Sequence, residues 1–126
     1  MSTQGFANLR SVVFDCPDPV SLANFYAAVL GGTTETGDPG FCVVNLEGSP
    51  RLAFQLVQHH QAPQWPEGTP QQIHLDLTVP DLSQASARAV ELGASVLKGP
   101  TEELGCTFIV HRDPAGHPFC LCQDQG

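Results

Sequence analysis

The stretch PQQIHLDLTVPDLSQASARAVELGASV, residues 70–96, decides the fold, because a strand pattern passes directly into a helix pattern within it. Side chains alternate between the two faces of a strand, so His74 and Asp76 are expected on the same face. Asp81 stands where a helix N-cap accepts hydrogen bonds from the first turn, and Gly93 stands where a helix ends. The stretch therefore predicts a strand with two polar side chains on one face, followed by a capped helix.

The same pattern occurs once before in the chain, which indicates an internal repeat. SVVFDCPDP (11–19) aligns with HLDLTVPDL (74–82) at a shift of 63, and Asp18 takes the N-cap position. SLANFYAAVLGG (21–32) aligns with SQASARAVELGA (83–94) at a shift of 62, so one residue is dropped at the turn. The apolar helix positions expected to be buried are Leu22, Phe25, Val29 and Leu30 in the first copy, and Leu82, Ala85, Ala89 and Leu92 in the second.

Three strand candidates follow each helix, separated by turns that contain glycine and proline. Phe54 aligns with Phe119 at a shift of 65, and Lys98-Gly99-Pro100 is predicted to end the first strand after the second helix. The candidates are residues 33–37, 40–46 and 51–57 in the first half, and residues 94–98, 104–111 and 118–123 in the second.

The fold class predicted from this order is α+β, with two tandem βαβββ modules. We expect one domain over residues 1–126, with a first module at about 8–57, a loop at 58–72 and a second module at about 73–124. A ferredoxin-like domain is the rival fold, but it places one hairpin between its helices, whereas three strand candidates stand between them here.

Composition narrows the classes of function. The chain has 126 residues, a net charge of −8 and only five Lys plus Arg, so a basic surface for nucleic acid or an anionic membrane is not expected. No apolar stretch approaches the roughly 20 residues of a membrane span, and no secretory signal is expected. The five cysteines lack CxxC spacing and are predicted to be reduced thiols, so we expect a cytoplasmic protein.

The chain resembles the vicinal oxygen chelate superfamily of glyoxalases, bleomycin-resistance proteins and extradiol dioxygenases, and most closely its glyoxalase-like domain proteins of unassigned function. The resemblance rests on CPDPVSLANFYAAVLGG (16–32), HLDLTVPDLSQASARAVELGA (74–94) and DPAGHPFCL (113–121). It implies that the two modules form an open sheet cup around a cavity, with the helices outside. Family habit also implies a homodimer.

Strand parity combined with this resemblance divides the strand residues into two sets. The set expected to face the helices is Val12, Phe14, Leu52, Phe54, Leu56, Leu75, Leu77, Phe119 and Leu121. The set expected to line the cavity is Ser11, Val13, Asp15, Ala53, Gln55, Val57, His74, Asp76, Thr78, Cys120 and Cys122.

The positions at which family members hold a metal are, by resemblance, Ser11, Gln55, His74 and Cys120. Family members often have a histidine or glutamine where Ser11 stands, and glutamates where Gln55 and Cys120 stand. Catalytic hard-metal sites prefer carboxylate and imidazole ligands, so no metal cofactor is expected. If a metal binds, its predicted ligands are Gln55, His74 and Cys120, and the ion is zinc, manganese, nickel or iron.

The sequence leaves three hypotheses. In the first, the cavity binds a small organic molecule through Asp15, Gln55, Trp65, His74, Asp76 and Cys120. In the second, the chain is a metal-dependent glyoxalase-type lyase, isomerase or dioxygenase that uses His74, or a metal-free enzyme with His74 as catalytic base oriented by Asp76. In the third, the cavity has lost its function and a partner surface is what matters, with His74 only a structural histidine bonded to Asp76 or to backbone.

Overall fold

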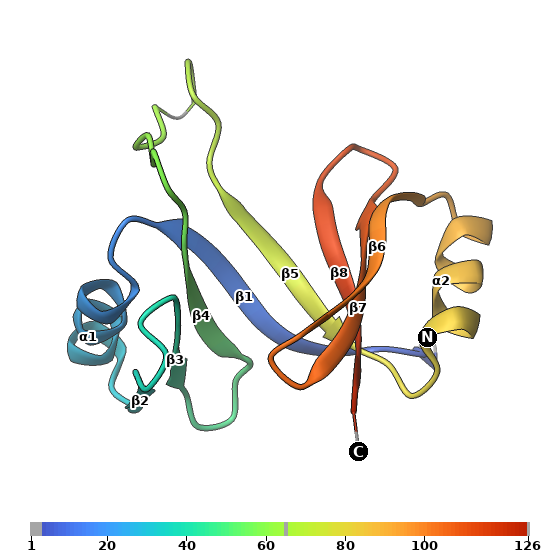
Figure 1. Ribbon diagram of the computed structural model, residues 1–126. Coiled ribbons are helices and arrows are strands. Elements are labelled where there is room, and N and C mark those ends of the chain that lie inside the picture. The colour runs from blue at the N-terminus through green and yellow to red at the C-terminus, as the bar shows by residue number, and fades with distance from the viewer. Residues whose placement is uncertain (1–3, 65, 126) are drawn as a thin grey trace. The chain divides into compact units, whose positions relative to one another are not determined.

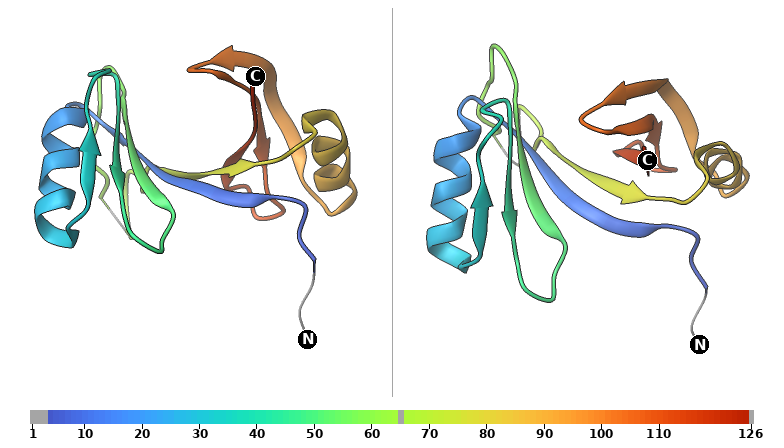
Figure 2. Two further views of the ribbon diagram at one scale, coloured as in Figure 1. Left: turned by 90° about the horizontal axis from the view of Figure 1, so that it is seen from below. Right: turned by 60° about the horizontal axis from the view of Figure 1, so that its bottom comes forward.

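The computed structural model describes residues 4–64 and 66–125. These residues form two compact units. The first module runs from Ser11 to Ile73, and the second module combines the chain up to Arg10 with the chain from His74 onward. In each module a four-stranded sheet carries one helix on one face (Figures 1 and 2).

The first module is a βαβββ unit. Its elements are β1 (Asn8–Cys16), α1 (Pro19–Leu30), β2 (Thr33–Glu35), β3 (Phe41–Asn45) and β4 (Arg51–Leu56). The strands lie in the order β2-β3-β4-β1. β1 and β4 pair in parallel, while β3 pairs antiparallel with both β2 and β4.

The second module repeats this arrangement. Its elements are β5 (Ile73–Thr78), α2 (Leu82–Glu91), β6 (Ser95–Glu103), β7 (Cys106–Arg112) and β8 (Pro118–Asp124). The strands lie in the order β5-β8-β7-β6. β5 and β8 pair in parallel, and β7 pairs antiparallel with β6 and β8.

The predicted α+β fold of two βαβββ modules is confirmed. One strand boundary was wrong, because β6 continues through Lys98-Gly99-Pro100 to Glu103. The register between β6 and β7 shifts at Val96/Lys98 and again at Lys98/Thr101. A strand irregularity of this kind accommodates glycine and proline without ending the strand.

Both helices begin at the predicted aspartates. Asp18 accepts a hydrogen bond from the backbone N–H of Ser21 at 3.2 Å, and Asp81 accepts one from Gln84 at 3.0 Å. Asp18 and Asp81 are equivalent N-caps and lie 63 residues apart. The sequence alignment that dropped one residue at the turn, with a shift of 62 in the helices, was therefore wrong. The shift of 63 therefore continues into the helices.

The buried face of each helix follows this corrected alignment. On α1, Phe25, Val29 and Leu30 were predicted to be buried, but they are more than half exposed, and so is Leu92 after α2. The inner positions lie three and four residues apart, as a helix requires. They are Pro19, Leu22, Ala23 and Tyr26 on α1, and Leu82, Ala85, Ser86 and Ala89 on α2, and each pair keeps the shift of 63.

Each module has its own core between helix and sheet. In the first module Phe54 is completely buried and its ring stacks on Phe14 and Tyr26, with centroids 5.4 and 5.6 Å away. In the second module Leu121 is buried with Leu77 and Phe119 against α2. These residues belong to the set predicted to face the helices. In the described part of the chain, neither helix is long and apolar enough to cross a membrane.

Candidate functional site

Three of the predicted site residues meet on one face of the second module's sheet. His74 and Asp76 lie on β5, and Asp76 is in register with Cys120 on β8. One donor atom from each of the three residues lies within 4.8 Å of the other two. Since Leu77 and Leu121 face α2, the alternation of side chains places the three polar residues on the helix-free face.

The contact between His74 and Asp76 is direct. Nε2 of His74 lies 3.3 Å from Oδ1 of Asp76, and the two side chains are 18% and 16% exposed. When Nε2 carries a proton and donates it to this carboxylate, Nδ1 of the neutral ring is the acceptor. A carboxylate that fixes the tautomer and orientation of an imidazole prepares the other nitrogen to accept a hydrogen bond or a proton.

The thiols on this face remain protonated at neutral pH. Burial, together with the negative charge of Asp76, raises the pKa of Cys120 to about 12. Burial and the same carboxylate also raise the pKa of Cys122, and burial raises that of Cys106. Because the thiolate is the nucleophile and the metal ligand, these cysteines act here as weakly polar groups.

Two further predicted residues meet in the first module. Asp15 on β1 is in register with Gln55 on β4. Nε2 of Gln55 donates to Oδ1 of Asp15 at 2.9 Å. Both side chains are half-buried, and the bond occupies the amide nitrogen of Gln55. Trp65 lies outside the described residues.

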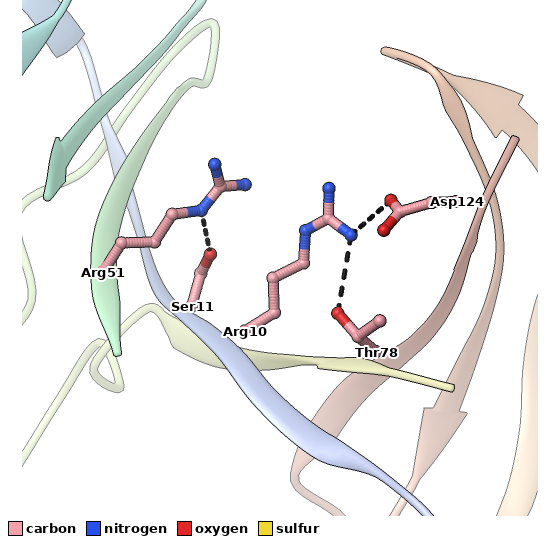
Figure 3. Close-up of polar contacts among 5 residues, drawn as sticks. All are labelled: Arg10, Ser11, Arg51, Thr78 and Asp124. Carbon is pink, nitrogen blue, oxygen red and sulfur yellow. Dashed lines mark hydrogen bonds and ion pairs between the residues drawn. The ribbon is translucent and has the colours of Figure 1, made fainter. Parts of the chain in front are cut away.

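Two arginines were missed by the sequence reasoning. Nε of Arg51 on β4 donates to Oγ of the fully buried Ser11 at 2.7 Å (Figure 3). In the second module, Nη1 of Arg10 forms an ion pair with Asp124 at 2.6 Å and contacts Oγ1 of Thr78 at 3.4 Å (Figure 3). Strand alternation could have identified Arg51, because it lies two residues before Ala53 on the same strand face. Strand alternation did not indicate Arg10. This residue lies two positions before Val12, so alternation would place it on the face toward the helix.

A third missed residue is His111 on β7, which is completely buried between α2 and the sheet. Its Nδ1 donates to the carbonyl of Ile109 at 3.0 Å, so its Nε2 accepts from Oγ of Ser86 at 2.8 Å. The ring stacks on Phe119 with centroids 5.1 Å apart. Burial lowers the pKa of His111, which favours the uncharged ring. This histidine is therefore a structural residue of the core and not part of the site.

The pairing of the strands also changes which residues correspond between the modules. β1 pairs Val13 with Ala53, and β5 pairs Asp76 with Cys120. The last strands therefore correspond at a shift of 67, and the alignment of Phe54 with Phe119 at 65 was wrong. Cys120 occupies the position of Ala53, and Gln55 corresponds to Cys122.

The residues fit a metal only in part. Imidazole, carboxylate and thiolate together suit a borderline ion such as zinc, and three protein ligands would leave an open position. Among the described residues, however, the group is His74, Asp76 and Cys120, with Asp76 in place of the predicted Gln55. Cys120 must also lose a proton that is held at a pKa of about 12.

Comparison with known proteins identifies the family. A family model described as a glyoxalase-like domain matches residues 11–122. Among curated proteins, none matches this chain.

Several solved structures share the fold. Methylmalonyl-CoA epimerase from Mycobacterium tuberculosis is 15% identical with a TM-score of 0.72, covering 100% of this chain and 94% of the other. A glyoxalase/bleomycin resistance protein/dioxygenase superfamily member from Vibrio splendidus 12B01 is 18% identical with a TM-score of 0.62, covering 94% and 99%. At these identities the structures support the fold alone.

Proposed function

Because the chain belongs to the glyoxalase-like domain family, we propose that it binds a small organic molecule on the helix-free face of the second module's sheet, without the usual metal centre. His74 is the central contact and Asp76 orients its ring. The observation that carries this proposal is the 3.3 Å contact between His74 Nε2 and Asp76 Oδ1, made by two partly buried side chains. A polar pair of this kind on a sheet face provides directional recognition that an apolar face lacks.

The geometry favours a ligand with a hydroxyl or N–H donor. Nδ1 of His74 is the nitrogen left to accept that donor when Nε2 is bonded to Asp76. The protonated Cys120 thiol, which is hydrogen-bonded to Asp76, adds a polarisable contact surface beside it. If the bound molecule reacts, His74 is the group that would take its proton as a general base.

The residues at the family's other ligand positions support the metal-free proposal. Ser11 accepts a hydrogen bond from Arg51, and a guanidinium at this position repels a metal cation. Gln55 donates an amide N–H to Asp15, so only its neutral Oε1 is available to a metal. Neither residue supplies the carboxylate or imidazole that a hard metal prefers.

A metal-dependent glyoxalase-type lyase, isomerase or dioxygenase is the second candidate. One observation favours it, namely the three donor atoms of His74, Asp76 and Cys120 within 4.8 Å of one another. A divalent ion bound there would polarise a substrate oxygen. These three side chains would hold it, and Cys120 would release its thiol proton.

The test compares the purified chain with a His74→Ala variant, both prepared without a histidine tag. Elemental analysis is expected to find no stoichiometric metal in either. A thermal-shift screen of small molecules is expected to find ligands that raise the Tm of the native chain by mass action and lose this effect in His74→Ala. His117→Ala, which removes an exposed histidine in the β7–β8 turn, should respond like the native chain.

About one zinc, manganese, nickel or iron per chain, lost in His74→Ala, would instead establish the metal-dependent candidate. Ligands whose effect survives in His74→Ala would overturn the assignment of this histidine. A cytoplasmic location, a homodimer and a single domain over residues 1–126 stay predictions.

A further inference from the structure

We propose that the first module carries a second binding site, for a small organic cation, where the described parts of the segment 57–72, which follows β4, lie beside the end of β1. The site consists of residues of the first module alone, so it does not depend on the role of His74. In Figure 1 this segment extends beyond the end of β4. The chain leaves β4 at Leu56 and returns beside Asp15, whose backbone N–H donates to the carbonyl of Gln72 at 3.1 Å.

The segment is held in place by its own hydrogen bonds. The N–H of Gln64 donates to the carbonyl of Thr69 at 2.8 Å, and Nε2 of Gln72 donates to the carbonyl of Gln61 at 2.9 Å. The N–H of Val57 donates to the carbonyl of Cys16 at 3.0 Å. These bonds shape an open cavity of about 260 Å³. Its lining includes Asp15, Val57, His59, His60, Thr69 and Gln72.

Gln72 gives the cavity an unsatisfied acceptor. Its Oε1 is buried and has no hydrogen-bond partner among the described residues. The amide nitrogen of Gln72 donates to the carbonyl of Gln61. The amide therefore cannot be flipped, because a flip would place its oxygen against that carbonyl oxygen. Buried polar atoms are nearly always paired, and an orphan calls for an explanation. Because Oε1 has almost no accessible surface, a ligand with an N–H donor supplies the missing bond after a small shift of the Gln72 side chain.

Asp15 supplies the charge. It is half-buried, and among residues 4–64 and 66–125 its carboxylate accepts a hydrogen bond from Nε2 of Gln55. An ionised carboxylate has about four lone-pair sites, so Asp15 retains acceptor capacity toward the cavity. Bonds from a cationic donor to a carboxylate are stronger than bonds between neutral groups. The carboxylate of Asp15 and the carbonyl oxygen of Gln72 together select a positively charged N–H donor.

The size and lining narrow the ligand further. A cavity of about 260 Å³ lies just below the range of roughly 300–1,000 Å³ that holds drug-sized molecules. Val57 provides an apolar wall for a short carbon chain, and the imidazoles of His59 and His60 can stack on a planar head group. We therefore assign an alkylguanidinium or alkylammonium group as the ligand.

A metal ion is the less suitable occupant. Among the described residues, the group of three metal-donating side chains within 4.8 Å of one another is His74, Asp76 and Cys120 in the second module. Asp15, His59 and His60 do not form such a group, although all three line the cavity.

The experiment is a titration of the full-length, ¹⁵N-labelled chain followed by amide chemical shifts. Four probes share one carbon chain and differ in the head group, namely n-butylguanidine, n-butylamine, n-butyrate and n-butanol. The two cations are expected to shift the amides of Asp15, Val57, His60 and Gln72, and the other two probes are not. Asp15→Asn keeps the shape and removes the charge, so it should raise the Kd for n-butylguanidine at least about tenfold.

Matched controls separate the site from general charge effects. Glu47→Gln removes an equal charge from an exposed turn of the same module and should leave the Kd unchanged. Gln72→Leu should weaken binding, whereas Gln71→Leu at the exposed neighbouring position should not. His74→Ala should also leave this titration unchanged, which distinguishes a failure here from a failure of the proposed function.

Three results would overturn the proposal. They are shifts of equal size with n-butyrate, shifts at the cavity with zinc chloride but not with the amines, and an Asp15→Asn variant that binds as tightly as Glu47→Gln. If Gln72→Leu fails to fold, as shown by its amide spectrum, the comparison of Asp15→Asn with Glu47→Gln decides the question alone.

Discussion

The two modules share one backbone plan and differ at two corresponding places. On the helix-free face, the first module has Val13 opposite Ala53, both completely buried in an apolar cluster with Val43. At the same positions the second module has Asp76 opposite Cys120. The repeat therefore retains the strand pairing, while this pair of positions changes from apolar to polar.

The second difference lies beneath the helices. The fifth residue after each N-cap aspartate is Ala23 on α1 and Ser86 on α2. The strand ladders place Val44 in the first module where the second has His111. Ala23 and Val44 belong to one apolar core, whereas Ser86 and His111 form a hydrogen bond 2.8 Å long. At these two places the second module carries polar and titratable groups, and the first module shows that the fold forms with apolar residues there.

The largest effect is expected from placing the second module's aspartate in the first module. Val13→Asp buries a carboxylate in the apolar cluster that Val13 forms with Val43 and Ala53. An uncompensated buried charge costs about 3–5 kcal/mol, so the free energy of unfolding should fall by that amount. Urea unfolding measures it.

Val29→Asp is the matched control, because Val29 is 60% exposed on α1. The same change there should cost about 1 kcal/mol or less, including the unfavourable helix dipole. If Val13→Asp costs no more than this control, the apolar face of the first module is not a requirement of the fold.

A smaller effect, confined to acid pH, is expected from the Ser86–His111 pair. The pKa of His111 in the folded chain is lowered from 6.5 by burial, so the unfolded chain binds a proton first as the pH falls below 6.5. The stabilisation that the neutral His111 provides is therefore fully present above pH 6.5. It is lost as the pH falls from 6.5 toward the pKa of His111 in the folded chain. The ring's neighbours, Ser86, the carbonyl of Ile109 and Phe119, do not titrate in this range.

The double variant Ser86→Ala/His111→Val reproduces the Ala23–Val44 contact of the first module and should lose this pH dependence. Urea unfolding from about pH 7.5 to about pH 5 measures the difference between the curves. His117→Ala, an exposed histidine paired with Asp113, should retain the native slope. A double variant with the native slope would assign the pH dependence to another group.

The fold was predictable because its signals are local and occur twice. Asp18 and Asp81 cap helices through bonds to residues three positions ahead, and strand alternation identifies Phe14 and Leu77 as facing the helices. The buried helix face was missed on α1 because Phe25, Val29 and Leu30 are apolar, and composition alone does not tell an exposed apolar side chain from a buried one.

Strand alternation alone predicted the site within one strand, and the family resemblance added Cys120 from a second strand. Alternation placed His74 and Asp76 on one face, and the structure brings Cys120 to them. The residue that pairs with Asp76 on the neighbouring strand depends on the strand register. The sequence alignment related the last strands of the two modules by a shift of 65, whereas the observed strand pairing relates them by 67. Contacts between elements far apart in the sequence, such as Arg10 with Asp124 and Ser86 with His111, have no local signal.

The smallest change in stability is expected from the reciprocal substitution, Asp76→Val, which gives the second module the residue of the first. Asp76 is partly buried beside His74 and two thiols of raised pKa, so its desolvation offsets most of what its contacts contribute. We expect the free energy of unfolding to stay within about 1 kcal/mol of the native value, or to rise.

The same variant should change the chemistry of the face. The pKa of Cys120 should fall below about 12, because a negative charge is removed, but stay above 9.0, because burial is the larger cause and remains. Alkylation of Cys120 as a function of pH, followed by mass spectrometry of its peptide, measures this. A loss of stability as large as that of Val13→Asp would instead make Asp76 a structural residue. Its pairing with His74 would then be a requirement of the fold and not of a ligand.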